Sequence, residues 1–129
     1  MGEVRKITLE QFKDEAKAQG VERVDITVIC PLCDTPQSMR ALIAAGAGAT
    51  EPDVEKFIGF SCVGRFTGAG SCFAKNHPKR IGCDYTLGGL FKLPKLIVLL
   101  PDGEEFPHFE IASKEQAEAL RQSLMAGAS

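Results

Sequence analysis

Long hydrophobic runs are missing from this sequence. Its most apolar stretch covers only residues 96–100, whereas a helix that crosses a bilayer needs about 20 apolar residues. The first ten residues, MGEVRKITLE, also lack the apolar segment of a secretory signal. We therefore expect a cytoplasmic protein that does not bind membranes. Structural disulfides are rare in the cytosol, so the five cysteines indicate metal binding, catalysis or simple burial.

Histidine is scarce as well, and His77 and His108 are the only two. Neither stands in a recognisable relation to a serine or a carboxylate, so the sequence does not support a hydrolase. We interpret His77 as an exposed loop residue and His108 as an outward-facing strand residue. The glycine-rich stretch 64–72 lacks the Gly-Lys-Ser/Thr of a phosphate-binding loop. A binding protein is therefore a better expectation than an enzyme.

The composition fits one small domain. The chain has 129 residues, of which 44% are hydrophobic and 25% charged, and this is enough to bury a modest core. Alternating apolar residues predict a strand at 23–30. Helix-capping residues predict helices at 9–19, at about 36–45, from 51 and from 114. These capping residues are Thr8, Thr35, Thr50 and Ser113.

The second half of the chain combines a hairpin with an irregular insert. Residues 95–112 predict a β-hairpin with Pro101-Asp102-Gly103 as its turn. Pro107 places the second arm at a sheet edge, where its missing N–H is tolerated. The insert, about 59–90, is rich in glycine, contains three cysteines and shows little periodicity. The whole pattern predicts a single α+β domain with flanking helices.

The cysteines carry the strongest chemical signal. Cys30 and Cys33 form a C-x2-C pair, which supplies two zinc ligands from one tight turn. Asp34 suits such a turn, because the residue after the second cysteine often needs a left-handed backbone, which Asp tolerates. The remaining ligands must come from the insert, where we favour Cys62 and Cys83. A zinc ion held by these four cysteines would stabilise an insert that burial alone would not.

Other interpretations of the cysteines stay open. Cys72 and His77, spaced C-x4-H, compete with Cys62 and Cys83 as ligands, and some thiols could be small buried apolar groups. A strand, C-P-x-C and a helix also form the layout of glutaredoxin-like thiol-disulfide oxidoreductases, which would use Cys30 and Cys33. Pro36 argues against that enzyme, because a helix beginning there leaves Cys30 away from the helix N-terminus.

Charge is unevenly distributed along the chain. The net charge is −2, yet residues 59–95 contain basic side chains opposed only by Asp84. This basic segment is explained equally well by a solvated loop and by a surface that binds an acidic partner. If the segment binds nucleic acid, its candidate phosphate contacts are Arg65, Lys75, Lys79 and Arg80. Aromatic residues there could stack on bases or cover the metal site, namely Phe60, Phe66, Phe73 and Tyr85. We favour the covering role for Phe60 and Tyr85.

Three stretches, CPLCDTPQSMRALIAAGA, GFSCVGRFTGAG and CDYTLGGLF, resemble a group of small cysteine-containing proteins encoded by phages, prophages and mobile elements. The resemblance covers about residues 7–112. It implies a bacterial cytoplasm, a host-interaction role and no particular activity. It also matches Cys30, Cys33, Cys62 and Cys83 to the family cysteines and leaves Cys72 as an extra.

Together, these features predict a small zinc-stabilised binding module that engages a host protein or nucleic acid. The alternative is the thiol-disulfide oxidoreductase.

Overall fold

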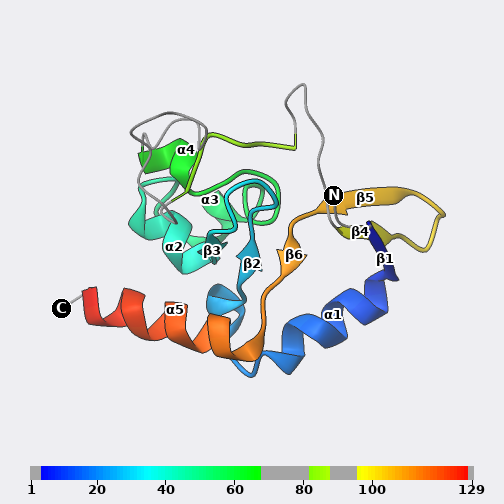
Figure 1. Ribbon diagram of the computed structural model, residues 1–129, viewed down its shortest axis with the longest axis horizontal. Coiled ribbons are helices and arrows are strands. Elements are labelled where there is room, and N and C mark those ends of the chain that lie inside the picture. Colours follow the sequence, from blue (N-terminus) through cyan, green and yellow to red (C-terminus); the bar gives the residue numbers. More distant parts are fainter. Residues whose placement is uncertain (1–3, 68–81, 88–95, 128–129) are drawn as a thin grey trace.

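The computed structural model describes residues 4–67, 82–87 and 96–127. These residues form two three-stranded sheets with helices packed around them, which confirms the predicted α+β class (Figure 1). None of the helices described is both long enough and apolar enough to cross a bilayer.

The first sheet has the strand order β1-β4-β5. Strand β1 (Arg5–Thr8) runs parallel to β4 (Leu96–Leu99), which pairs antiparallel with β5 (Glu105–His108). The predicted hairpin is confirmed, and its turn closes where the Gly103 N–H donates to the Leu100 carbonyl at 2.9 Å. Pro107 lies on β5 at the edge of the sheet, as expected. Strand β1 is too short and irregular in pattern for the sequence to predict it.

The second sheet has β2 (Val28–Ile29) between β3 (Pro36–Gln37) and β6 (Glu110–Ile111). Strands β5 and β6 follow one another along the chain with Phe109 between them, so one segment joins the two sheets (Figure 1). The predicted strand at 23–30 is wrong over its first half, where η1 (Arg23–Asp25) is a 3-10 turn. Bidentate pairing of the buried Asp25 with Arg40 fixes this turn.

Three of the predicted helix starts are confirmed. Helix α1 (Leu9–Ala18) begins with a capping box at Thr8 and is followed by Gly20 at φ +70°. The short helix α3 (Glu51–Val54) is capped at Thr50. Helix α5 (Lys114–Gly127) follows a reciprocal pair of hydrogen bonds between Ser113 and Gln116.

The fourth predicted start is wrong, because α2 (Met39–Ala44) does not begin at Pro36. Its N-cap is Ser38, whose hydroxyl accepts from the Ala41 N–H at 3.2 Å. Pro36 instead lies on β3 opposite Ile29, at a sheet edge where a missing N–H is tolerated. Helix α2 therefore begins further from Cys30 than the sequence predicts. A last short helix, α4 (Gly64–Thr67), follows Cys62.

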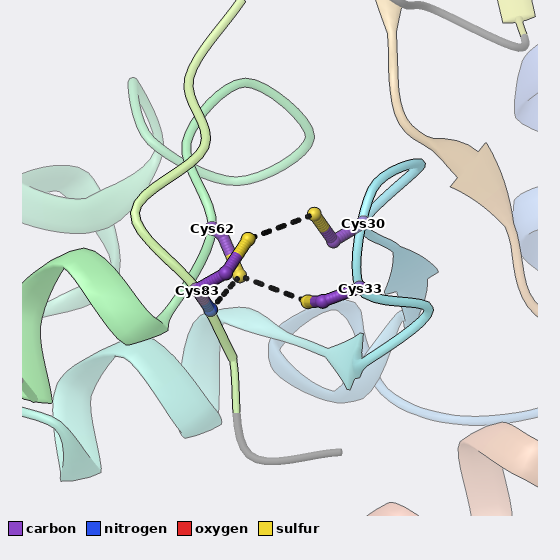
Figure 2. Close-up of side chains that lie close together, drawn as sticks. All are labelled: Cys30, Cys33, Cys62 and Cys83. Atoms are coloured by element: carbon purple, nitrogen blue, oxygen red, sulfur yellow. Dashed lines mark hydrogen bonds between the residues drawn. The ribbon is translucent and has the colours of Figure 1, made fainter. Parts of the chain in front are cut away.

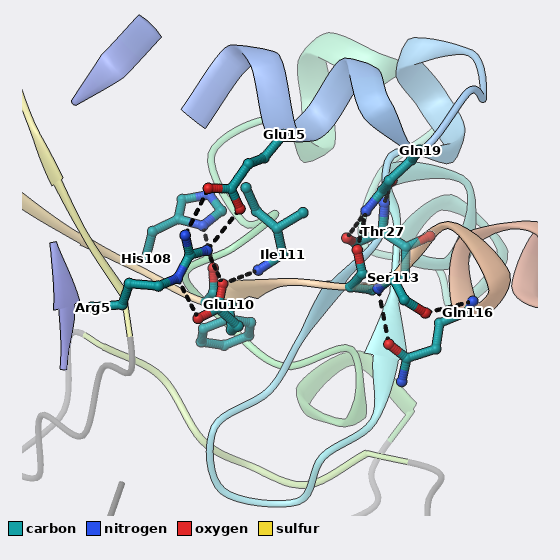
Figure 3. Close-up of polar contacts among 11 residues, drawn as sticks. Arg5, Glu15, Gln19, Thr27, His108, Glu110, Ile111, Ser113 and Gln116 are labelled. Carbon is teal, nitrogen blue, oxygen red and sulfur yellow. Dashed lines mark hydrogen bonds and ion pairs between the residues drawn. The ribbon is translucent and has the colours of Figure 1, made fainter. Parts of the chain in front are cut away.

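Gln19 links α1 to the second sheet, and its loss is expected to destabilise the fold. Its side chain is 3% exposed and donates to the carbonyls of Thr27 and Ala112 at 2.8 and 2.9 Å (Figure 3). It also accepts from the Thr27 N–H at 2.8 Å. Gln19→Leu leaves these buried groups unpaired, so urea unfolding should show a loss of about 2–4 kcal/mol.

The matched control is Gln122→Leu, because Gln122 is exposed and its side-chain amide donates to its helix neighbour Glu118 at 3.1 Å. That change should alter the free energy of unfolding by less than about 0.5 kcal/mol. Equal losses in the two variants would contradict a structural role for the buried amide.

Candidate metal centre

The Cys30–Cys33 turn follows β2 directly. The Cys30 N–H donates to the Thr35 carbonyl at 3.2 Å, and the Asp34 N–H donates to the Cys30 carbonyl at 2.9 Å. Asp34 has φ +60°, which confirms the left-handed residue expected after the second cysteine. These backbone bonds hold both sulfurs on the same side of the turn (Figure 2).

Cys62 and Cys83 come from two segments that pair with each other. The Cys62 N–H donates to the Tyr85 carbonyl and the Leu87 N–H to the Phe60 carbonyl, both at 2.9 Å. Ser61 and Thr86 form an antiparallel bridge between the same segments. This pairing brings together two cysteines that lie far apart in the sequence.

Two glycines allow these segments to approach closely. A Cβ atom on Gly64 would lie 2.3 Å from the Cys83 nitrogen, and one on Gly82 would lie 2.7 Å from Gly64 Cα. Gly82 also has φ +96°, which an L side chain rarely adopts. Neither position therefore accepts a larger residue without moving the cysteine beside it.

The four sulfur atoms of Cys30, Cys33, Cys62 and Cys83 all lie within 4.8 Å of one another (Figure 2). The Sγ–Sγ distance is 3.8 Å between Cys30 and Cys83 and 3.7 Å between Cys33 and Cys62. A tetrahedral ion with metal–sulfur bonds of about 2.3 Å requires sulfur–sulfur distances of about 3.8 Å. The cluster is therefore the right size to hold a metal ion.

Hydrogen-bond donors surround the sulfurs on two sides. Cys62 Sγ accepts from the Cys83 N–H at 3.3 Å and from Gln37 Nε2 at 3.5 Å. Thr35 Oγ1 lies 3.1 Å from Cys33 Sγ and accepts from the Gly82 N–H at 2.9 Å. A metal-bound thiolate can only accept, so the Thr35 hydroxyl donates to Cys33 in that state. Such outer contacts orient the ligands of a metal site.

The thiols also set one another's charge. Hydrogen bonding with Cys30 lowers the pKa of Cys33 to about 6, and hydrogen bonding with Cys30 lowers the pKa of Cys62 far below its ordinary value. The pKa of Cys30 is raised, mainly by its hydrogen bond with Cys33, and that of Cys83 mainly by its bond with Cys30. The lowered pKa values thus fall on Cys33 and Cys62, the two sulfurs that face the added donors, because a hydrogen bond to a thiolate favours its charged form.

The centre is closed to solvent on most sides. Cys30, Cys62 and Cys83 are 0% exposed, and Cys33 is partly exposed. Tyr85 and Phe109 belong to the same buried cluster, and Phe60 packs against it. The expected covering role of Phe60 and Tyr85 is thus confirmed, and Tyr85 is too buried to stack on a nucleic-acid base.

The basic segment is described only at one of its candidate contacts. Arg65 is exposed, and its guanidinium donates to the Asp84 carbonyl at 2.8 Å. Phe66 packs its ring against Phe57, with centroids 4.8 Å apart. The remaining candidates lie outside the described residues, namely Cys72, Phe73, Lys75, His77, Lys79 and Arg80.

The interpretation of His108 as outward-facing is wrong. Its ring is partly buried, meets Phe12 edge to face with centroids 4.8 Å apart, and lies against Gly59. The strand alternation misleads here, because β5 ends at His108 and the chain then turns Phe109 into the core. Sequence reasoning also missed Gln37, whose only signal is its place four residues after Cys33.

Gln37 is expected to support both the fold and metal affinity. It is 0% exposed, accepts from the Val63 N–H at 2.8 Å and donates to Cys62 Sγ. Gln37→Met keeps the volume but removes these bonds, so we expect a loss of about 2–3 kcal/mol in the free energy of unfolding. We also expect metal affinity to fall by roughly 10- to 100-fold. Chelator competition measures the affinity.

A second substitution separates the acceptor of Gln37 from its donor, which bonds the Thr35 carbonyl at 3.2 Å as well as Cys62 Sγ. Gln37→Glu keeps an acceptor for Val63 but removes the donor to Cys62 and to the Thr35 carbonyl, and it adds negative charge beside both. Its metal affinity should fall at least as far as that of Gln37→Met. Unchanged affinity in both variants would show that Gln37 serves packing alone.

A model of the VVA0879-like family matches residues 8–112 of the chain, a span that contains all four cysteines of the cluster. No curated protein and no solved structure matches the chain.

Proposed function

The chain belongs to the VVA0879-like family, and we propose that it is a small zinc-stabilised binding module of phage, prophage or mobile-element origin. One observation carries the proposal, namely four cysteine sulfurs within 4.8 Å of one another in a buried cluster. In this proposal the metal holds the irregular segment in place, and the surface around it engages a host protein or nucleic acid.

The cluster suits a structural zinc site better than a catalytic metal site. Structural zinc sites are tetrahedral and are filled by four protein ligands, whereas catalytic sites keep one position open. Four thiolates leave no such position, and three of the four cysteines are 0% exposed. Iron also accepts four thiolates, so the metal analysis must distinguish the two.

Metal analysis of the full chain, purified without added zinc, tests this proposal. We expect one zinc per chain and four cysteines that react with a thiol reagent only after the metal is removed. A coloured, iron-loaded protein would contradict the choice of zinc. A metal-free protein with five freely reacting thiols would contradict the metal site itself.

The partner half of the proposal has its own test. Arg65 is exposed and donates to the carbonyl of Asp84, the residue after Cys83, and the neighbouring segment is basic, which supports a negatively charged partner. Binding to nucleic acid should weaken steeply as salt rises and should fall in the Arg65, Lys79 and Arg80 triple alanine variant. Binding that is absent or insensitive to salt would leave a host protein as the partner to pursue.

The redox alternative finds less support. Its nucleophile would be Cys30, which is 0% exposed and whose pKa is raised by hydrogen bonding with Cys33. Helix α2 begins only at Met39, so its N-terminus does not stabilise a Cys30 thiolate. Disulfide reductase activity that is lost in Cys30→Ser would restore this alternative.

A further inference from the structure

A groove lies beside His108, away from the sulfurs. It encloses about 460 Å³ between α1, the segment 55–60 and the β4–β5 hairpin. Its apolar walls include Phe12, Ile58, Val98, Leu100 and Phe106, and Glu55 and Lys56 are its charged lining residues. A smaller hollow of about 210 Å³ adjoins it and shares Phe12, Ile58 and His108. We call this feature the His108 groove.

The imidazole of His108 carries one hydrogen-bond acceptor that no described residue occupies. Its Nδ1 lies 2.7 Å from the Phe109 carbonyl, which can only accept, so Nδ1 carries the proton and Nε2 has a free lone pair. Within the described residues, every fully buried side-chain nitrogen or oxygen has a partner. Nε2 has none there, so it is not fully buried, and His108 lines both hollows.

The orientation of this acceptor is fixed by packing. The ring of Phe12 holds one side of the imidazole, with an interplanar angle of 73°. Gly59 has φ +76°, and a Cβ atom there would lie 2.0 Å from Nε2. The absence of a side chain at Gly59 therefore leaves room for the imidazole. Burial lowers the pKa of His108, which favours the neutral ring.

We propose that the His108 groove binds a small aromatic molecule that carries one hydrogen-bond donor, such as a hydroxyl group, directed at His108 Nε2. The volume falls in the range of small-molecule pockets, about 300–1,000 Å³. The walls favour an apolar ring. Lys56 lies over the Phe57 ring at 5.1 Å and Glu55 pairs with Arg23 at 3.0 Å, so both charged lining residues already have partners and an uncharged ligand fits best.

NMR titration of the full, metal-loaded chain with phenol and with anisole tests the proposal. The two probes share a ring, but only phenol can donate to Nε2. We expect saturable shifts at the groove residues, a change in the His108 side-chain ¹⁵N signal with phenol, and phenol affinity about tenfold higher than that of anisole. Equal affinities, or shifts confined to another surface, would overturn the proposal.

Two variants sharpen the result. His108→Phe keeps a ring but removes the acceptor, so the preference for phenol should disappear while anisole still binds. Leu100→Trp should fill the groove and abolish the binding of both probes, whereas Val4→Trp, at a residue 47% exposed and outside the lining, should not.

The spectrum of each variant reports whether it is folded. If Leu100→Trp does not fold, Phe106→Trp at the exposed lip takes its place. Unchanged binding in the filled groove would also overturn the proposal.

Discussion

Replacing Cys62 with serine is expected to abolish the proposed zinc binding and to unfold the region around the metal centre. Cys62 is 0% exposed, lies 3.7 Å from Cys33 Sγ and accepts from the Cys83 N–H at 3.3 Å. Structural zinc contributes an apparent free energy of about 10–16 kcal/mol in small domains. The total stability of a domain is only about 5–15 kcal/mol, so the loss of the metal is of the same size as the whole.

Cys72→Ser is the matched control for this change. Cys72 lies outside the described residues, and the four clustered cysteines already complete a tetrahedral set. The control should keep one zinc per chain and its thermal unfolding midpoint, whereas Cys62→Ser should lose the metal and the cooperative transition in circular dichroism. Retention of zinc by Cys62→Ser with a midpoint near that of the wild type would contradict a structural metal.

The sequence predicts those parts of the fold that depend on neighbouring residues. The capping boxes at Thr8 and Ser113 are local reciprocal hydrogen bonds, so the residue types alone identify them. The turn at Gly103 and the left-handed Asp34 follow from similar local preferences. These features depend on residues within a few positions of one another, so the local sequence is enough to predict them.

The parts that the sequence does not predict depend on distant contacts. Pro36 looks like a first helical residue, but pairing with Ile29 places it on a strand. Strand β1 is specified by its parallel partner β4. His108 becomes part of a groove only because Gly59 and Phe12 come to it from other segments.

The candidate site divides in the same way. The Cys30–Cys33 turn is a local pattern, and Cys62 and Cys83 are the cysteines that the structure brings to it. The contributions of Gln37 and Gly64 depend on how the paired segments meet, so no spacing rule identifies them. Their effects must be tested by substitution.

Gly64→Ala is expected to separate the two paired segments and to weaken metal binding. Alanine favours helix formation over glycine by about 1 kcal/mol, and Gly64 begins α4 without a left-handed backbone. Local preference therefore predicts a stabilising change. The added Cβ, however, would lie 2.3 Å from the nitrogen and 2.6 Å from the oxygen of Cys83, and backbone atoms cannot rotate away.

The control for Gly64→Ala is Gly103→Ala in the hairpin turn. Gly103 differs from Gly64 in both respects. Its φ of +90° is unfavourable for alanine, but no atom lies within 4 Å of an added Cβ. We expect Gly103→Ala to cost about 1–2 kcal/mol and to leave zinc affinity unchanged.

Gly64→Ala should lower the free energy of unfolding, measured in urea, by more than about 2 kcal/mol. It should also lower zinc affinity, measured by chelator competition, by at least about tenfold. The direction of the Gly64→Ala change is decisive, because helix propensity and the contact with Cys83 predict opposite signs. A stabilised variant with intact zinc affinity would mean that the close approach of Gly64 and Cys83 is not needed to hold the cluster.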